Sequence, residues 1–68
     1  MDMIEKAKIR LEHWMEHNSH HLEDYEEFAA DLEAAGRKES AEYIRQVAAL
    51  TAKTNELMKK ALNSLSNV

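Results

Sequence analysis

The five residues AAGRK, residues 34–38, contain the only glycine of the 68-residue chain, which has no proline. Glycine suits the position just after a helix, because it adopts the left-handed conformation there without a side-chain clash. A sheet protein would need more turn-forming residues than this chain offers. The stretch therefore predicts an all-α protein that turns once, with one helix before Gly36 and one after it.

Apolar residues repeat with a period of seven on both sides of the glycine, which is typical of helices that pack against each other. Asp2 and Glu5 have the spacing of an N-terminal capping box. We therefore predict an antiparallel two-helix hairpin, with helices at about 3–35 and 38–65, as a single domain over residues 1–68. The repeat predicts seam positions at Ile4, Ala7, Leu11, Trp14, Tyr25, Phe28, Leu32 and Ala35, and then at Ile44, Val47, Thr51, Thr54, Met58, Ala61 and Leu65.

Composition and charge narrow the classes of protein. The chain has no cysteine, and its formal net charge is −4 at pH 7. The longest apolar run, residues 47–50, is far too short for a membrane span or a signal-peptide core. The negative charge argues against nucleic acid and anionic membranes as partners. These features predict a protein without disulfides that is either cytoplasmic or a piece of something larger.

The stretch EHWMEHNSHHLED, residues 12–24, holds all four histidines and interrupts the apolar repeat. Asn, Ser and His are poor helix formers, and the central run costs roughly 2 kcal/mol relative to alanine. A break near Asn18–Ser19 would give a three-helix bundle. The repeat favours a continuous helix, because it passes from Trp14 to Tyr25 without a slip.

A polar layer is predicted where the hairpin closes. Folding the chain about Gly36 places Asn18 opposite Asn55, and His21 opposite Thr51 or Ala52. Such a layer can fix register and oligomeric state at some cost in stability, or it can bind a ligand between the helices. Both interpretations remain open. The predicted ligand-facing residues are Asn18, Thr51, Asn55 and Trp14, with Trp14 chiefly packed in the core.

The histidines also predict a metal site. His13, His17 and His21 recur every fourth residue, and Asp24 falls on the same side of the helix. Imidazoles at this spacing can chelate Zn²⁺ or Ni²⁺, with carboxylates attracting the cation and orienting the rings. His17 and His21 are the stronger candidates because they border the seam, whereas His13 and His20 fit a solvated face.

The assembly state and the function follow from the apolar surface. Several residues widen the apolar stripe beyond a two-helix seam: Met15, Leu22, Ala29, Ala48 and Leu62. A homodimer would bury them in a four-helix bundle; alternatively, the groove takes helices of another protein. No nucleophile motif or phosphate-binding glycine loop is present. We therefore predict a small non-enzymatic binding or assembly module whose polar layer binds a transition metal, or a pure interaction module in which that layer only sets register.

The runs HWMEHNSHH (residues 13–21) and TAKTNEL (residues 51–57) resemble a group of known sequences. These are short, uncharacterised prokaryotic helical-hairpin proteins with His-Trp-x-x-His-Asn-x-x-His and a later Thr-x-x-x-Asn. The resemblance covers most of the chain and implies a shared site without naming its use. The residues it implies are His13, Trp14, His17, Asn18, His21, Thr51 and Asn55.

Overall fold

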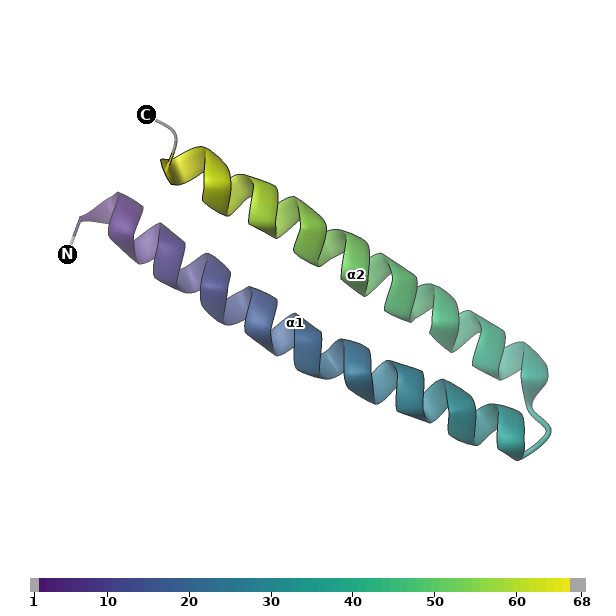
Figure 1. Ribbon diagram of the computed structural model, residues 1–68. Helices are drawn as coiled ribbons and strands as arrows, with labels where there is room; N and C mark the ends of the chain where they lie inside the picture. Colours follow the sequence, from purple (N-terminus) through teal and green to yellow (C-terminus); the bar gives the residue numbers. More distant parts are fainter. Residues whose placement is uncertain (1, 67–68) are drawn as a thin grey trace.

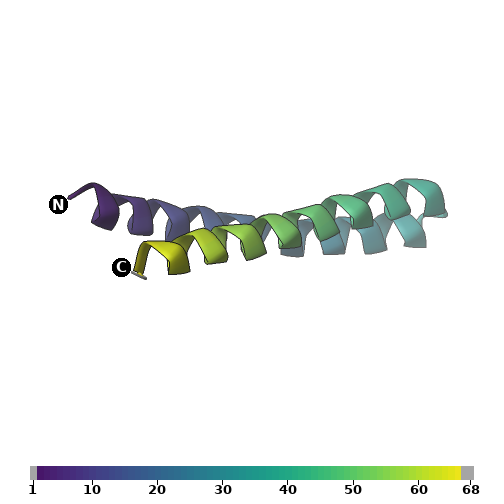
Figure 2. The ribbon, with the colours of Figure 1, turned by 90° about the horizontal axis from the view of Figure 1, so that it is seen from above.

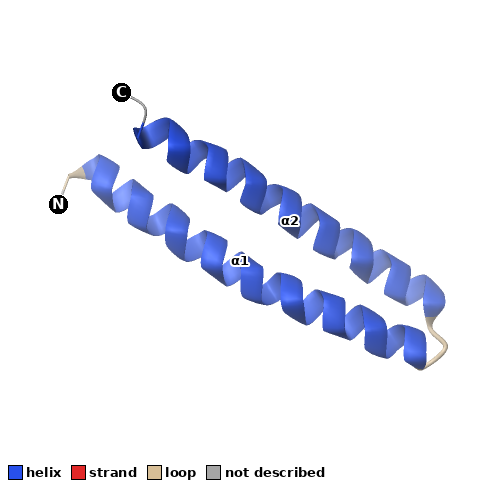
Figure 3. Ribbon diagram, in the orientation of Figure 1, coloured by secondary structure: helices blue, strands red, loops and turns tan. Residues whose placement is uncertain are grey.

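The computed structural model describes residues 2–66 and forms one antiparallel helical hairpin (Figure 1). Helix α1 spans Met3–Ala34 and helix α2 spans Lys38–Ser66. They are joined by a short connection (Figure 3) and wind gently around each other (Figure 2). The principal extents are 51 × 17 × 10 Å, so the molecule is a single layer of helices. No helix within residues 2–66 has the length and apolar character needed to cross a membrane.

Local signals set the ends of the helices. Asp2 caps α1, and its side chain accepts a hydrogen bond from the backbone N–H of Glu5 at 2.8 Å. At the other end, Gly36 has φ +80, the left-handed conformation that glycine adopts most easily. The N–H of Arg37 donates to the carbonyl of Leu32 at 2.8 Å, which closes a Schellman turn. The predicted helix ends are correct to within one residue.

Helix α1 runs without a break through its histidine-rich segment, so the three-helix alternative is wrong. The hydroxyl of Ser19 donates to the carbonyl of Met15 at 3.0 Å, one turn back along the same helix. This bond satisfies a polar side chain that would otherwise favour a helix start or a turn. The seven-residue repeat therefore predicted continuity correctly.

From Leu11 onward, the seam between the helices follows the predicted repeat at every second position and misses it at the others. Trp14 is 47% exposed and Phe28 50% exposed, although both were predicted in the seam. Their C-terminal neighbours face α2 instead, since adjacent helical residues point about 100° apart. The seam consists of buried or half-buried residues at alternating spacings of three and four: Leu11, Met15, Asn18, Leu22, Tyr25, Ala29 and Leu32 of α1, and Ala41, Ile44, Ala48, Thr51, Asn55, Met58, Leu62 and Leu65 of α2.

Small residues determine where the helices approach. Among residues 2–66, only Ala29, Ala41 and Ala48 are buried. An alanine side chain lets two backbones come close, whereas Trp14 or Phe28 at the same place would hold them apart. Trp14 and Phe28 therefore lie at the flank of the seam.

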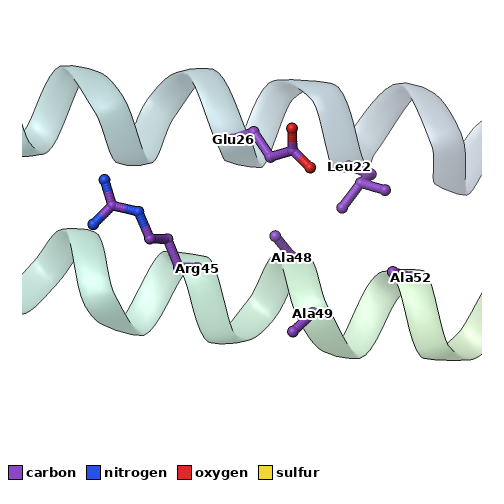
Figure 4. A pocket seen from close by; sticks show the side chains of 6 residues that line it. All are labelled: Leu22, Glu26, Arg45, Ala48, Ala49 and Ala52. Atoms are coloured by element: carbon purple, nitrogen blue, oxygen red, sulfur yellow. The ribbon is translucent and has the colours of Figure 1, made fainter.

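The hairpin has two broad faces of different character. On the first, which we call the charged face, Arg45 of α2 pairs with Glu33 of α1. A shallow groove on this face is lined by Glu26 of α1 and by Arg45 and Ala52 of α2 (Figure 4). The residues on the flank of each helix away from Glu26, Glu33 and Arg45 therefore lie together on the opposite side of the hairpin. This second side, the apolar face, carries Trp14, His21 and Phe28 of α1 and Val47, Thr54 and Ala61 of α2.

Candidate functional site

An asparagine pair links the two helices near their midpoints. The amide Nδ2 of Asn18 donates to Oδ1 of Asn55 at 3.0 Å. Nδ2 of Asn55 in turn donates to the backbone carbonyl of Met15 at 3.0 Å and to the hydroxyl of Ser19 at 3.2 Å. Within residues 2–66, no buried side-chain nitrogen or oxygen lacks a partner. The predicted meeting of Asn18 and Asn55 is confirmed, and the layer is satisfied by the protein itself.

The other predicted members of the polar layer do not join it. The Thr51 hydroxyl donates to the carbonyl of Val47, and the Thr54 hydroxyl to the carbonyl of Leu50, both at 2.9 Å and both within α2. Such local bonds satisfy threonine without a partner on the facing helix. The cross-helix layer is therefore narrower than predicted.

Trp14 lies outside the core and contacts its own helix. The guanidinium carbon of Arg10 lies 5.9 Å from the centroid of the Trp14 ring, one turn away on α1. At that distance a cation–π attraction is weak but favourable. The prediction that Trp14 packs in the hairpin core is wrong, because the seam passes through Met15.

Three aromatic rings form a ladder along α1 beside the asparagine pair. The ring centroids of His17 and His21 lie 4.5 Å apart and the planes are tilted by 40°. His21 also stacks on Tyr25, with centroids 5.9 Å apart and an interplanar angle of 13°. His21 is half-buried and His17 is exposed. Tyr25 therefore restrains His21, and the two histidines present adjacent rings on the flank of the apolar face.

The remaining histidines, His13 and His20, are both exposed, and His13 borders Trp14 as well as the outer surface of α1. The rings of His13 and His17 are 6.5 Å apart, too far for the two to share one small cation without moving. His20 lies 4.0 Å from Glu16, and both side chains are highly exposed. A shallow hollow on the outer surface of α1 is lined by His13, Glu16, His17 and His20. Within residues 2–66, no three metal-ligating side chains come together, and Asp24 adds no third ligand to His17 and His21.

A second apolar stripe follows the exposed side of α2, and the sequence interpretation did not recognise it. Leu50 is 66% exposed and Leu57 is 58% exposed. The stripe has the same alternating spacing of four and three as the seam, which could have revealed it. It carries no charged residue and consists of Tyr43, Val47, Leu50, Thr54, Leu57 and Ala61.

The fold and these surfaces define a class of protein: an antiparallel helical hairpin with a hydrogen-bonded asparagine pair inside and an apolar face outside. Residues 7–65 match a family described as a domain of unknown function, DUF8180, and the chain belongs to that family. It is also 33% identical over 60 residues to a protein of Archaeoglobus fulgidus described as uncharacterized. That alignment covers 88% of this chain and 95% of the archaeal protein. No solved structure matches the chain.

These comparisons agree with the resemblance to short uncharacterised helical proteins. They support a small helical domain that occupies nearly the whole length of its archaeal relative. The shared His-Trp pattern remains a prediction, as do the roles of Asn18, Thr51, Asn55 and Trp14 in binding a ligand.

Proposed function

We propose that this chain is a non-enzymatic assembly module in which two hairpins pack through their apolar faces to form a four-helix bundle. The observation that carries the proposal is the exposed apolar stripe of α2, together with Trp14 and Phe28 of α1. These side chains are larger than the alanines buried in the seam. Fully burying a Leu or Phe side chain contributes about 1.5–3 kcal/mol, and the isolated hairpin leaves most of that contribution unused.

The surface area of the hairpin supports a second layer of helices. Its accessible surface is 5440 Å², whereas a compact monomer of the same mass exposes about 4,400 Å². The excess of about 1,000 Å² is close to what each partner contributes to a standard protein interface, about 800 Å². Globular domains are built from packed layers around a core, and one hairpin supplies only one of them.

A second copy of the chain is the partner that best fits the charges on this face. The α2 stripe is uncharged, so it can pack against its own copy without burying a charge. On α1, Arg10 lies toward one end of the helix, and Asp24 and Asp31 lie toward the other. An antiparallel approach of two α1 helices directs each arginine toward the acidic half of its copy. The arrangement is self-complementary, as a twofold interface requires.

The asparagine pair has a defined part in this proposal. Its hydrogen bonds fix which residues of α1 face which residues of α2. A polar pair in an otherwise apolar seam costs some stability but penalises shifted registers. Closing the hairpin in one register keeps the two halves of the apolar face aligned, so that a partner meets one continuous surface.

Sedimentation equilibrium over a range of micromolar concentrations tests the proposal. We expect the native chain to have twice the mass of one chain. Replacing Leu50 and Leu57 together by Glu places two charges in the stripe and should yield monomers. Gln46→Glu with Lys53→Glu is the matched control, because these exposed positions lie on the outer side of α2. We expect the control to remain dimeric.

The possible outcomes separate the occupants of the apolar face. A native chain that stays monomeric and melts at high temperature would overturn self-assembly and leave a helix of another protein as the occupant. Loss of the dimer in the control as well would place the interface elsewhere on the hairpin.

A further inference from the structure

From the positions of His17 and His21, we infer that the assembled protein has a tetrahedral Zn²⁺ site to which each of two copies contributes this histidine pair. The inference rests on the proposed dimer, because the site is incomplete without the second copy. It goes beyond assembly in naming a ligand, its chemistry and the place where the two chains meet.

The geometry of the pair is close to that of a chelate. With Zn–N distances of about 2.0–2.1 Å, two imidazoles on a tetrahedral ion have ring centroids roughly 5 Å apart. The centroids of His17 and His21 are 4.5 Å apart, whereas those of His13 and His17 are 6.5 Å apart. The separation of the first pair is therefore the closer of the two to the chelate distance. The stacking of His21 on Tyr25 restricts its ring, which lowers the entropy lost on binding.

One hairpin alone offers too few ligands. A structural zinc site has four protein ligands, and within residues 2–66 no group of three is present. Two imidazoles on one helical turn therefore give an open half-site. Two such half-sites supply the full set of four nitrogen ligands, a type of ligand that suits Zn²⁺ and Ni²⁺.

The position of the pair along α1 decides whether two copies can meet. The helix spans Met3–Ala34, so its midpoint falls between Asn18 and Ser19, at the height of the histidine pair. If two α1 helices pack antiparallel along their full length, the twofold axis crosses their midpoints, and only residues near the midpoint meet their own copies. His17 and His21 lie on the two sides of that point and on the flank of the apolar face. A histidine pair near either end of α1 would lie far from the same pair in the second copy.

The surrounding charges favour a cation at this place. Residues 11–35 contain eight acidic residues and neither lysine nor arginine. The negative potential of this segment attracts a divalent cation. Asp24 lies one turn beyond His21 on the same flank. Its carboxylate can orient an imidazole in the manner of the outer ligands common around zinc.

Zinc titration of the full chain, combined with sedimentation, tests the inference. We expect one Zn²⁺ per two chains, and Co²⁺ as a probe should give the intense visible absorption of a tetrahedral site. His17→Ala and His21→Ala should each weaken zinc affinity by about 100-fold or more, since even loss of an outer partner costs 10–100-fold. The matched controls His13→Ala and His20→Ala should bind zinc as the native chain does. Circular dichroism in the presence of chelator checks that every variant is folded.

Three outcomes would overturn the inference, and they differ in what they say about assembly. A dimer in chelator that takes up no zinc overturns the metal site alone. Uptake of one zinc per chain that requires His13 or His20 places the metal in the outer hollow of α1 instead. A chain that stays monomeric both in chelator and in zinc overturns the metal site together with the proposed dimer.

Discussion

The seam and the apolar face divide the hydrophobic residues of this hairpin unequally. The seam buries three alanines and half-buries the asparagine pair and larger side chains such as Leu22 and Met58, whereas the apolar face exposes Trp14, Phe28, Leu50 and other large side chains. A chain whose folding ended at the hairpin would leave the apolar area of that face exposed, although the stabilisation from burial grows with apolar area. The difference indicates that the residues that close the hairpin and those that hold a partner are separate sets on adjacent helical positions.

The two sets have different physical tasks. Small side chains let α1 and α2 approach closely, and hydrogen bonds then fix their register. Large side chains exposed on a single layer of helices provide apolar surface against which a second layer can pack. Two neighbouring pairs show the division directly, Phe28 with Ala29 and Val47 with Ala48: the larger residue lies on the apolar face and the alanine in the seam.

The largest change in stability is expected from enlarging a seam alanine. Ala29 is 1% exposed, and we expect Ala29→Leu to lower the free energy of unfolding by about 1–3 kcal/mol, because the helices must separate to admit the side chain. The matched control is Ala30→Leu, the same substitution at the adjacent exposed position. It should change stability by less than about 0.5 kcal/mol. Urea unfolding at one fixed protein concentration measures both, and equal effects would show that α1 does not pack through Ala29.

A second comparison concerns the asparagine pair inside the seam. Asn55→Leu removes three hydrogen bonds and leaves polar atoms of Asn18, Met15 and Ser19 without this partner. We expect a loss of about 1–3 kcal/mol. Replacing both asparagines by leucine should restore native stability or exceed it, because the mismatch of a polar and an apolar residue disappears.

A double-mutant cycle in urea gives the coupling between the two asparagines. Residues in contact should deviate from additivity by at least about 0.5 kcal/mol. The doubly substituted chain should also form a wider range of oligomers, since nothing polar then penalises a shifted register. Simple addition of the two single effects would mean that Asn18 and Asn55 do not meet in solution.

The hairpin and its register could be predicted from the sequence. The helix ends depend on local signals, and the register follows from counting residues outward from the turn. Gly36 ends a helix by its own conformational preference, and Asp2 caps one through a bond three residues away. Counting outward from the turn was enough to pair Asn18 with Asn55. Continuity of α1 followed from a repeat that did not slip.

The other half of the seam could not be predicted by periodicity. At Trp14 and Met15, and at Val47 and Ala48, two neighbouring residues are both apolar, so a seven-residue repeat fits either one. Which of them turns inward depends on the distance between the helices, a tertiary property. Thr51 lies in the seam as predicted, but its hydroxyl donates to a carbonyl within its own helix, a local bond that periodicity does not predict.

The smallest effect is expected on the charged face. Arg45 pairs with Glu33 across the two helices and lies 4.0 Å from Glu42, and all three side chains are substantially exposed. Exposed ion pairs contribute about 0–1 kcal/mol, and salt screens them. We therefore expect Arg45→Ala to lower the free energy of unfolding by less than about 1 kcal/mol, and by less still in high salt. Lys53→Ala, on the outer side of α2, is the control for loss of a positive charge. Sedimentation should find both variants as dimeric as the native chain, because the proposed interface lies on the opposite side of the hairpin. If Arg45→Ala alone dissociates the dimer, the two hairpins meet through the charged face, and the large side chains of the apolar face remain open to a different partner.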